Sequence, residues 1–158
     1  MSAADERLLE TPTVDAIVIY ESLTGNTRKA AERIAEELIT GGVGVRAVSP
    51  TASIDFQALS ESDLVVVGTW VDGLVLFGQR PGGKVRDVPA LTGKKAVAYC
   101  TYAVAPGRTL DKMTTLLTDR GAEALGGMAI NRRKVVDESK DFVDRVLGAL
   151  DAEIDPLG

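Results

Sequence analysis

The alternation of short, solidly apolar runs with amphipathic segments constrains this chain's fold most strongly. The run at 16–20, Ala-Ile-Val-Ile-Tyr, is apolar or aromatic at every position, as expected for a strand buried on both faces. Four similar runs are expected to be strands, at residues 43–48, 64–67, 96–100 and 125–130. Between them, helical periodicity is expected at residues 26–40, 109–118 and 138–150.

The segment 26–40 shows the helical pattern most clearly. Ala30, Ile34 and Leu38 form one apolar stripe, and Ala31, Ala35 and Ile39 are expected beside it. Charged residues fill the other face, and Gly41-Gly42 is a helix stop signal. This helix should therefore cover one face of the sheet.

Repeated strand–helix alternation predicts an α/β fold with a doubly wound, five-stranded parallel sheet between two helical layers. Residues 14–151 are expected to form this one domain, with a flexible tail at 1–13 and a C-terminal tail at 152–158. The Gly- and Pro-rich stretch 68–89 has room for only a short helix. No internal repeat or low-complexity tract interrupts the pattern.

The chain of 158 residues contains no His and one Cys. A catalytic triad, a His proton shuttle and a His-ligated metal are therefore excluded, and a single Cys cannot form an internal disulfide. Cys100 ends an apolar run and is interpreted as a small core residue. Redox chemistry would need a cofactor, and neither catalytic nor metal-binding residues are predicted.

The formal net charge of −5 argues against nucleic acid binding, which depends on neutralising phosphates. It is compatible with docking on a basic partner face. No apolar run is long enough for a membrane span, and the first ten residues do not resemble a secretory signal. We therefore expect a cytoplasmic protein.

The loop that follows the first predicted strand is rich in hydrogen-bond donors. Ser22, Thr24, Asn26 and Thr27 surround Gly25, directly before the helix. Backbone N–H groups at a helix N-terminus favour anions, and one capping residue would suffice if the loop were only a helix start. A phosphate site is thus favoured over a simple N-cap.

The segment Ser-Leu-Thr-Gly-Asn-Thr at 22–27 resembles the phosphate loop of flavodoxins, [ST]-x-T-G-x-T, at every specified position. The resemblance extends over about residues 14–150. It implies the flavodoxin strand order 2-1-3-4-5 and FMN as cofactor, bound at the switch point between the first and third strands.

Two further loops complete the flavodoxin-like site that the resemblance implies. After the third strand, Trp70 would stack on the flavin and the turn Val71–Asp72–Gly73 would supply a peptide near flavin N5. After the fourth strand, Tyr102 would face the ring, whereas Arg108 stands where flavodoxins often carry acids. The full set of implied FMN contacts is Ser22, Leu23, Thr24, Gly25, Asn26, Thr27, Thr69, Trp70, Val71, Asp72, Gly73, Thr101, Tyr102 and Gly107.

Two other functions, an NTPase and a phosphorelay receiver, are rejected. The segment 78–84 fits G-x-x-x-x-G-K, but Val85 stands where an NTPase needs a hydroxyl for Mg²⁺. A phosphorelay receiver needs an aspartate at the end of the third strand, where this chain has Gly68 and Thr69. The apolar run at 74–77, Leu74 to Phe77, is either core or an exposed docking loop for a partner.

Three functions remain open. The favoured one is an electron carrier that shuttles electrons between a reductase and an acceptor protein through bound FMN. The second is an FMN-dependent reductase or oxidase acting on a quinone or a similar small acceptor. The third is a flavin-free interaction module of the same fold.

Overall fold

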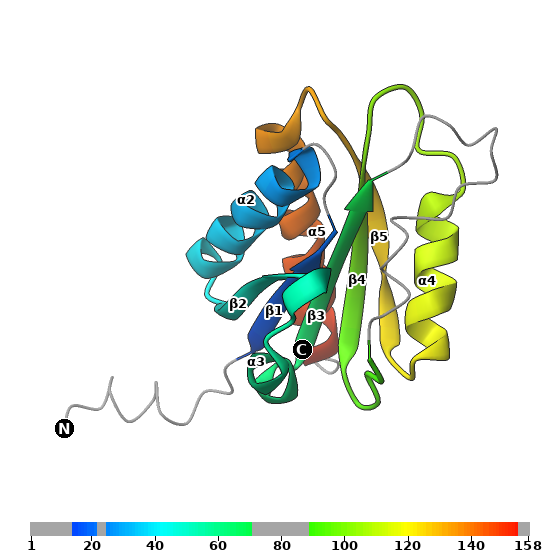
Figure 1. The fold of residues 1–158 in the computed structure, drawn as a ribbon. Coiled ribbons are helices and arrows are strands. Elements are labelled where there is room, and N and C mark those ends of the chain that lie inside the picture. The colour runs from blue at the N-terminus through cyan, green and yellow to red at the C-terminus, as the bar shows by residue number, and fades with distance from the viewer. Residues whose placement is uncertain (1–13, 22–24, 71–88, 155–158) are drawn as a thin grey trace, which may run out of the picture.

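The computed structural model of the chain describes residues 14–21, 25–70 and 89–154 (Figure 1). The expectations for residues 1–13, 22–24, 71–88 and 155–158 lie outside this part. The described elements are, in chain order, β1 (Asp15–Tyr20), α2 (Asn26–Thr40), β2 (Gly44–Pro50), the 3-10 turn η1 (Thr51–Ser53), α3 (Phe56–Glu61), β3 (Leu64–Trp70), β4 (Lys95–Tyr102), α4 (Thr109–Asp119), β5 (Glu123–Asn131) and α5 (Val135–Ile154).

The five strands form one parallel sheet in the order β2-β1-β3-β4-β5. This confirms the predicted fold class and strand order. The order changes direction at β1, because β2 lies on one side of β1 and β3 lies on the other. The carboxyl ends of β1 and β3 therefore flank the switch point at which such sheets bind ligands.

Helices cover both faces of the sheet (Figure 1). Helices α2 and α5 pack together on one face, and α3 and α4 lie on the other. The sheet side chains divide into one buried cluster under each layer, as expected from strands with apolar residues at every position. None of the helices in the described ranges is long and apolar enough to cross a membrane.

One residue of the predicted α2 stripe is not buried. Ala30, Ile34 and Leu38 are fully buried, as predicted, whereas Ile39 is 58% exposed. Ile39 follows Ala30 by nine residues, and nine rotations of 100° amount to two and a half turns of the helix. Ile39 therefore lies on the opposite side of the helix from Ala30, and its assignment to the buried face was wrong.

Helix α3 was not predicted from the sequence, and helix α5 is longer than predicted. Helix α3 has six residues, too few for a periodic pattern, and it begins where the Asp55 carboxylate accepts a hydrogen bond from the Ala58 N–H at 2.9 Å. Helix α5 begins three residues earlier and ends four residues later than predicted. In its added first turn Val135 packs against the core, whereas Val136 is exposed.

The third and fourth strands extend further than their apolar runs. Thr69 and Trp70 pair with Cys100 and Thr101, so β3 and β4 continue as neighbours through residues that were expected in loops. Parallel pairing continues there because backbone hydrogen bonds do not depend on apolar side chains. Thr69, Trp70, Thr101 and Tyr102 are thus strand residues at the carboxyl edge.

Candidate functional site

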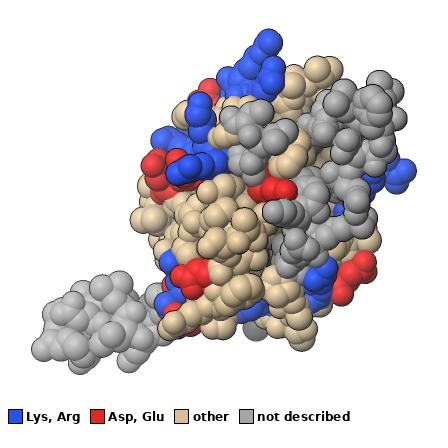
Figure 2. Space-filling model, viewed as in Figure 1, with Lys and Arg blue, Asp and Glu red and all other residues tan. Residues whose placement is uncertain are grey.

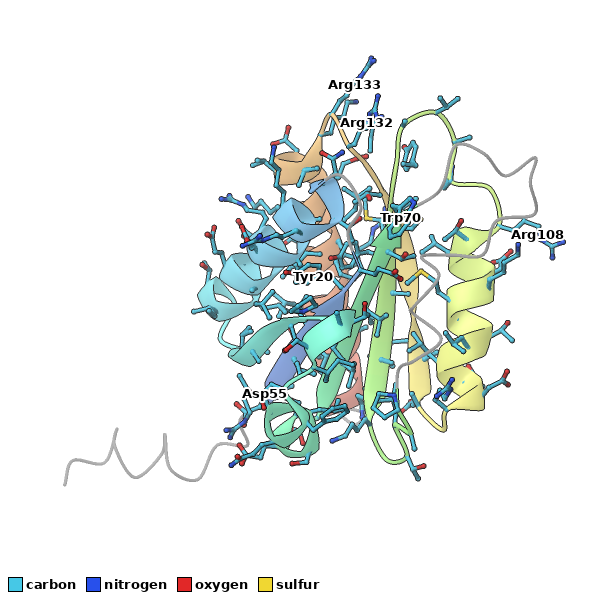
Figure 3. All side chains as sticks on the ribbon, viewed as in Figure 1. Tyr20, Asp55, Trp70, Arg108, Arg132 and Arg133 are labelled. Atoms are coloured by element: carbon cyan, nitrogen blue, oxygen red, sulfur yellow. The ribbon has the colours of Figure 1, made fainter. Side chains whose placement is uncertain are left out.

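The candidate site is the carboxyl edge of β1, β3 and β4. Tyr20 at the end of β1 pairs with Gly68, and the Glu21 N–H donates to the Gly68 carbonyl at 2.9 Å. Beyond this point β3 continues for two residues, to Trp70. Figure 3 shows Trp70 at this edge, while Asp55 lies at the opposite end of the molecule.

Helix α2 begins at this edge in a form that suits an anion. Its N-cap is Gly25, in the left-handed region with φ 93°, a conformation that a residue with a Cβ adopts only with strain. The Gly25 carbonyl accepts the first helical hydrogen bond from the Lys29 N–H at 2.9 Å. The first turn carries no acidic residue to compensate the positive end of the helix dipole.

Two residues of β4 hold the first turn of α2 on the sheet. Thr27 is buried, and its hydroxyl lies 2.8 Å from the hydroxyl of Thr101. The Tyr99 hydroxyl donates to the Thr27 carbonyl at 2.9 Å. The structure thereby brings together Thr27 and Thr101, which the resemblance assigned to two separate loops.

The paired hydroxyls retain hydrogen-bonding capacity. Each hydroxyl carries one proton, and the contact between Thr27 and Thr101 uses only one of the two. The other proton remains for a further acceptor. One hydroxyl proton of this pair, together with the N–H groups of the helix N-terminus, can therefore donate to an anionic group.

Gly68 makes room for Tyr99. The two residues are neighbours on β3 and β4, and a Cβ added at Gly68 would overlap the Tyr99 ring. The ring is fully buried and packs against Phe142 of α5 with 5.9 Å between ring centroids. Burial raises the pKa of Tyr99 well above its usual value, so its hydroxyl remains a donor at neutral pH.

Sequence reasoning did not select Gly68 or Tyr99 as site residues. A signal was present, because an isolated glycine in an apolar strand pattern often marks a close approach of another group. The identity of that group could not be read, since Tyr99 is 31 residues further along the chain.

The aromatic residues Trp70 and Tyr102 end two neighbouring strands and are partly buried. Thr69, next to Trp70, is fully buried, and its hydroxyl has no hydrogen-bond partner among the described residues. Gly107 and the exposed Arg108 follow in the connection to α4, where Val104 is 90% exposed. Ser22 to Thr24 and Val71 to Gly73 lie outside the described residues.

Cys100 is fully buried in the cluster beneath α3 and α4. Burial raises the pKa of its thiol to about 12, because the thiolate would lose its hydration. The thiol is therefore neutral at physiological pH, in agreement with its interpretation as a core residue rather than a nucleophile.

Two grooves border the start of α2. One, of about 550 Å³, lies on the β2 side and is lined by residues that include Tyr20, Gly25 and Thr51. The other, of about 450 Å³, lies between α2 and the β5–α5 connection and includes Asn26. Both grooves thus include a residue of the helix start.

An open parallel sheet of order 2-1-3-4-5, with an anion-suited helix start at its switch point, defines a flavodoxin-like α/β protein. The family model for the flavodoxin domain matches residues 17–112, and the chain belongs to this family. Comparison with curated protein sequences gives no match.

Solved flavodoxin structures share the fold at low sequence identity. The flavodoxin of Streptococcus pneumoniae TIGR4 has a TM-score of 0.67 at 20% identity, over 89% of this chain and 99% of that one. The two-electron reduced Megasphaera elsdenii flavodoxin has a TM-score of 0.63 at 20% identity, over 85% and 96%. The oxidised Flavodoxin 2 from Bacillus cereus has a TM-score of 0.64 at 20% identity, over 89% and 99%.

Proposed function

We propose that this protein binds FMN non-covalently and carries electrons between a reductase and an acceptor protein. The observation that carries the proposal is the Thr27 site. In this member of the flavodoxin family, the buried Thr27 at the start of α2 forms hydrogen bonds with Thr101 and Tyr99 of β4. The proposed site therefore joins two elements of the switch-point edge.

The donor set fits the phosphate of FMN. A phosphate dianion is stabilised by backbone N–H groups at a helix N-terminus and by hydroxyl donors. Gly25, Asn26 and Thr27 begin that helix, and Ser22, Leu23 and Thr24 precede it in the matching motif. We assign these six residues to the phosphate.

The strand ends fit the flavin ring. Trp70 and Tyr102 offer aromatic faces at the ends of adjacent strands, and aromatic side chains stack well on flat ring systems. Thr69, Thr101, Gly107 and the turn Val71–Gly73 complete the proposed contacts. When bound, the flavin supplies the electron-transfer chemistry, and the protein supplies binding and electrostatic surroundings.

The purified protein tests the assignment directly. We expect a yellow protein that releases FMN, identified by chromatography, when it is denatured. A colourless protein that takes up no added FMN would overturn the proposal and favour a flavin-free interaction module. Oxidation of NAD(P)H by the protein alone with a quinone acceptor would instead make it an enzyme.

A further inference from the structure

The groove between α2 and α5 has the opposite charge from the chain as a whole. Its lining holds five cations and three carboxylates, a net charge of +2, whereas the chain carries −5. The cations are Lys29 and Arg33 on α2 and Arg132, Arg133 and Lys134 after β5. Figure 2 shows Lys and Arg side chains gathered at the end of the molecule where this groove lies.

Ion pairing separates these cations into two groups. Arg33 binds Glu36 at 3.4 Å and Glu37 at 2.9 Å, so its charge is compensated on its own helix. Within the described ranges, Lys29, Arg132, Arg133 and Lys134 form no ion pair. Glu32 on the groove wall is paired with Arg28 at 2.9 Å, and Asp137 is the remaining acid of the lining.

The turn that presents the cations is held by hydrogen bonds. The Arg133 N–H donates to the Asn131 side chain at 2.9 Å, and the Lys134 N–H donates to the Asn131 carbonyl at 2.8 Å. The Arg132 N–H donates to the Tyr102 carbonyl at 2.9 Å. The cationic turn is thereby fixed to Tyr102, one of the proposed flavin contacts.

An exposed apolar side chain lies among the cations. Val136 lines the groove and is 57% exposed. Figure 3 shows Arg132 and Arg133 projecting beyond the same edge of the sheet as Trp70. A small free anion would need converging buried donors, whereas exposed cations around an apolar residue are typical of a protein interface.

We propose that this groove docks an acidic surface of a partner protein, with carboxylates opposite Lys29 and Arg132–Lys134 and an apolar side chain against Val136. Complementary charge steers such encounters and fixes the orientation of the two proteins. Docking would bring the partner next to Tyr102. Only the electron-transfer role of this contact rests on the proposed FMN function.

Charge reversal with a matched control tests the groove. Two double variants change the net charge equally. The test variant is Arg132→Glu/Arg133→Glu, and the control variant is Lys140→Glu/Arg145→Glu. Lys140 and Arg145 are exposed on α5 and do not line the groove. The probe is a fluorescent peptide of alternating Glu and Leu, and its binding to flavin-free protein is measured by fluorescence anisotropy at rising salt.

We expect peptide binding that weakens with salt, as for any contact between exposed charges. Arg132→Glu/Arg133→Glu should weaken peptide binding about tenfold. The reversal of two charges changes the charge of the groove by roughly four units, and each exposed charge contributes a small amount of attraction. The control variant should remain within about twofold of the parent protein.

Equal loss in both variants, or no peptide binding at low salt, would overturn the proposal. Tighter binding of single-stranded DNA than of the peptide would also overturn it and make the groove a nucleic acid site. Because the peptide is measured without flavin, its binding is independent of whether FMN binds. A parallel FMN titration of the parent protein shows separately whether the flavin site exists.

Discussion

An added methyl group at Gly68 would disturb the candidate site. The Tyr99 ring occupies the space over Gly68, and both its packing and its hydroxyl bond to Thr27 depend on that space. We expect Gly68→Ala to lower the free energy of unfolding by about 1–3 kcal/mol, as for overpacking of a buried core. Urea unfolding measures this loss.

Gly148→Ala is the matched control for that substitution. Gly148 lies in α5, where an added Cβ meets no atom within 4 Å. Alanine in a helix interior is favoured over glycine by roughly 0.5–1 kcal/mol, so this variant should be slightly more stable than the parent. Equal destabilisation by both substitutions would contradict the role of Gly68.

Tyr99→Phe isolates the hydroxyl that holds the start of α2. The ring and its packing remain, but the Thr27 carbonyl loses its buried donor, which should cost about 1–2 kcal/mol of stability. Because Thr27 begins the proposed phosphate site, FMN affinity should fall more than riboflavin affinity. Tyr99 would thus act as a positioning residue.

Asp55→Ala supplies the control for the Tyr99 variant. Loss of the α3 N-cap should cost about 1 kcal/mol of stability at the far end of the molecule. It should leave the ratio of FMN to riboflavin affinity unchanged. If Asp55→Ala shifts that ratio as much as Tyr99→Phe does, general destabilisation explains both effects.

Trp70→Ala tests the proposed ring contact. Loss of one aromatic stack should weaken FMN binding by about 1–3 kcal/mol, and riboflavin binding by the same amount, because both ligands carry the same ring. Trp70→Phe should retain part of the affinity. Fluorescence titration of the flavin gives both constants, and an unchanged affinity would exclude Trp70 as a ring partner.

Cys100 should make stability depend on pH in the alkaline range. Its pKa is raised from 9.0 to about 12 in the folded chain, so the folded state holds the thiol proton more tightly than the unfolded state. This contribution is complete below the unfolded pKa and is lost as the pH rises toward the folded one. Between pH 9 and about 12, Cys100→Ala should therefore lose less stability than the parent in urea unfolding. Tyr99 titrates in both proteins and cancels in the comparison.

At the scale of elements, the order of strands and helices could be predicted wherever an element carries its own local sequence pattern. The run 16–20 and the stripe of α2 are local patterns, and parallel topology follows from their alternation. Helix α3 has no such pattern, since its six residues span fewer than two turns. The Asp55 cap was its main local signal.

The extended ends of β3 and β4 could not be read from the sequence for a different reason. Thr69 and Thr101 are polar, and their strand conformation depends on backbone pairing between segments far apart in the chain. The same holds for the contacts of Tyr99 with Gly68 and Thr27. Motif resemblance identified Thr27 and Thr101, but their direct contact required the fold.

At the scale of the whole molecule, the sign of the net charge is a poor guide to its distribution. Of the ion pairs on α2, Arg28–Glu32 uses two exposed side chains and therefore contributes little to stability, whereas Arg33 and Glu37 are partly buried. These ion pairs matter more for the groove, because they neutralise Glu32 and Glu36 and leave its other cations uncompensated. A net charge of −5 is compatible with docking on a basic partner, whereas the groove favours an acidic one.

The most direct test of the central claim compares two ligands that differ only in a phosphate. Calorimetric titration of flavin-free protein with FMN and with riboflavin measures both affinities under one set of conditions. A phosphate held at the start of α2 by charge-assisted hydrogen bonds should make FMN at least about tenfold tighter than riboflavin. Equal affinities, or no binding of FMN, would contradict the proposed phosphate site.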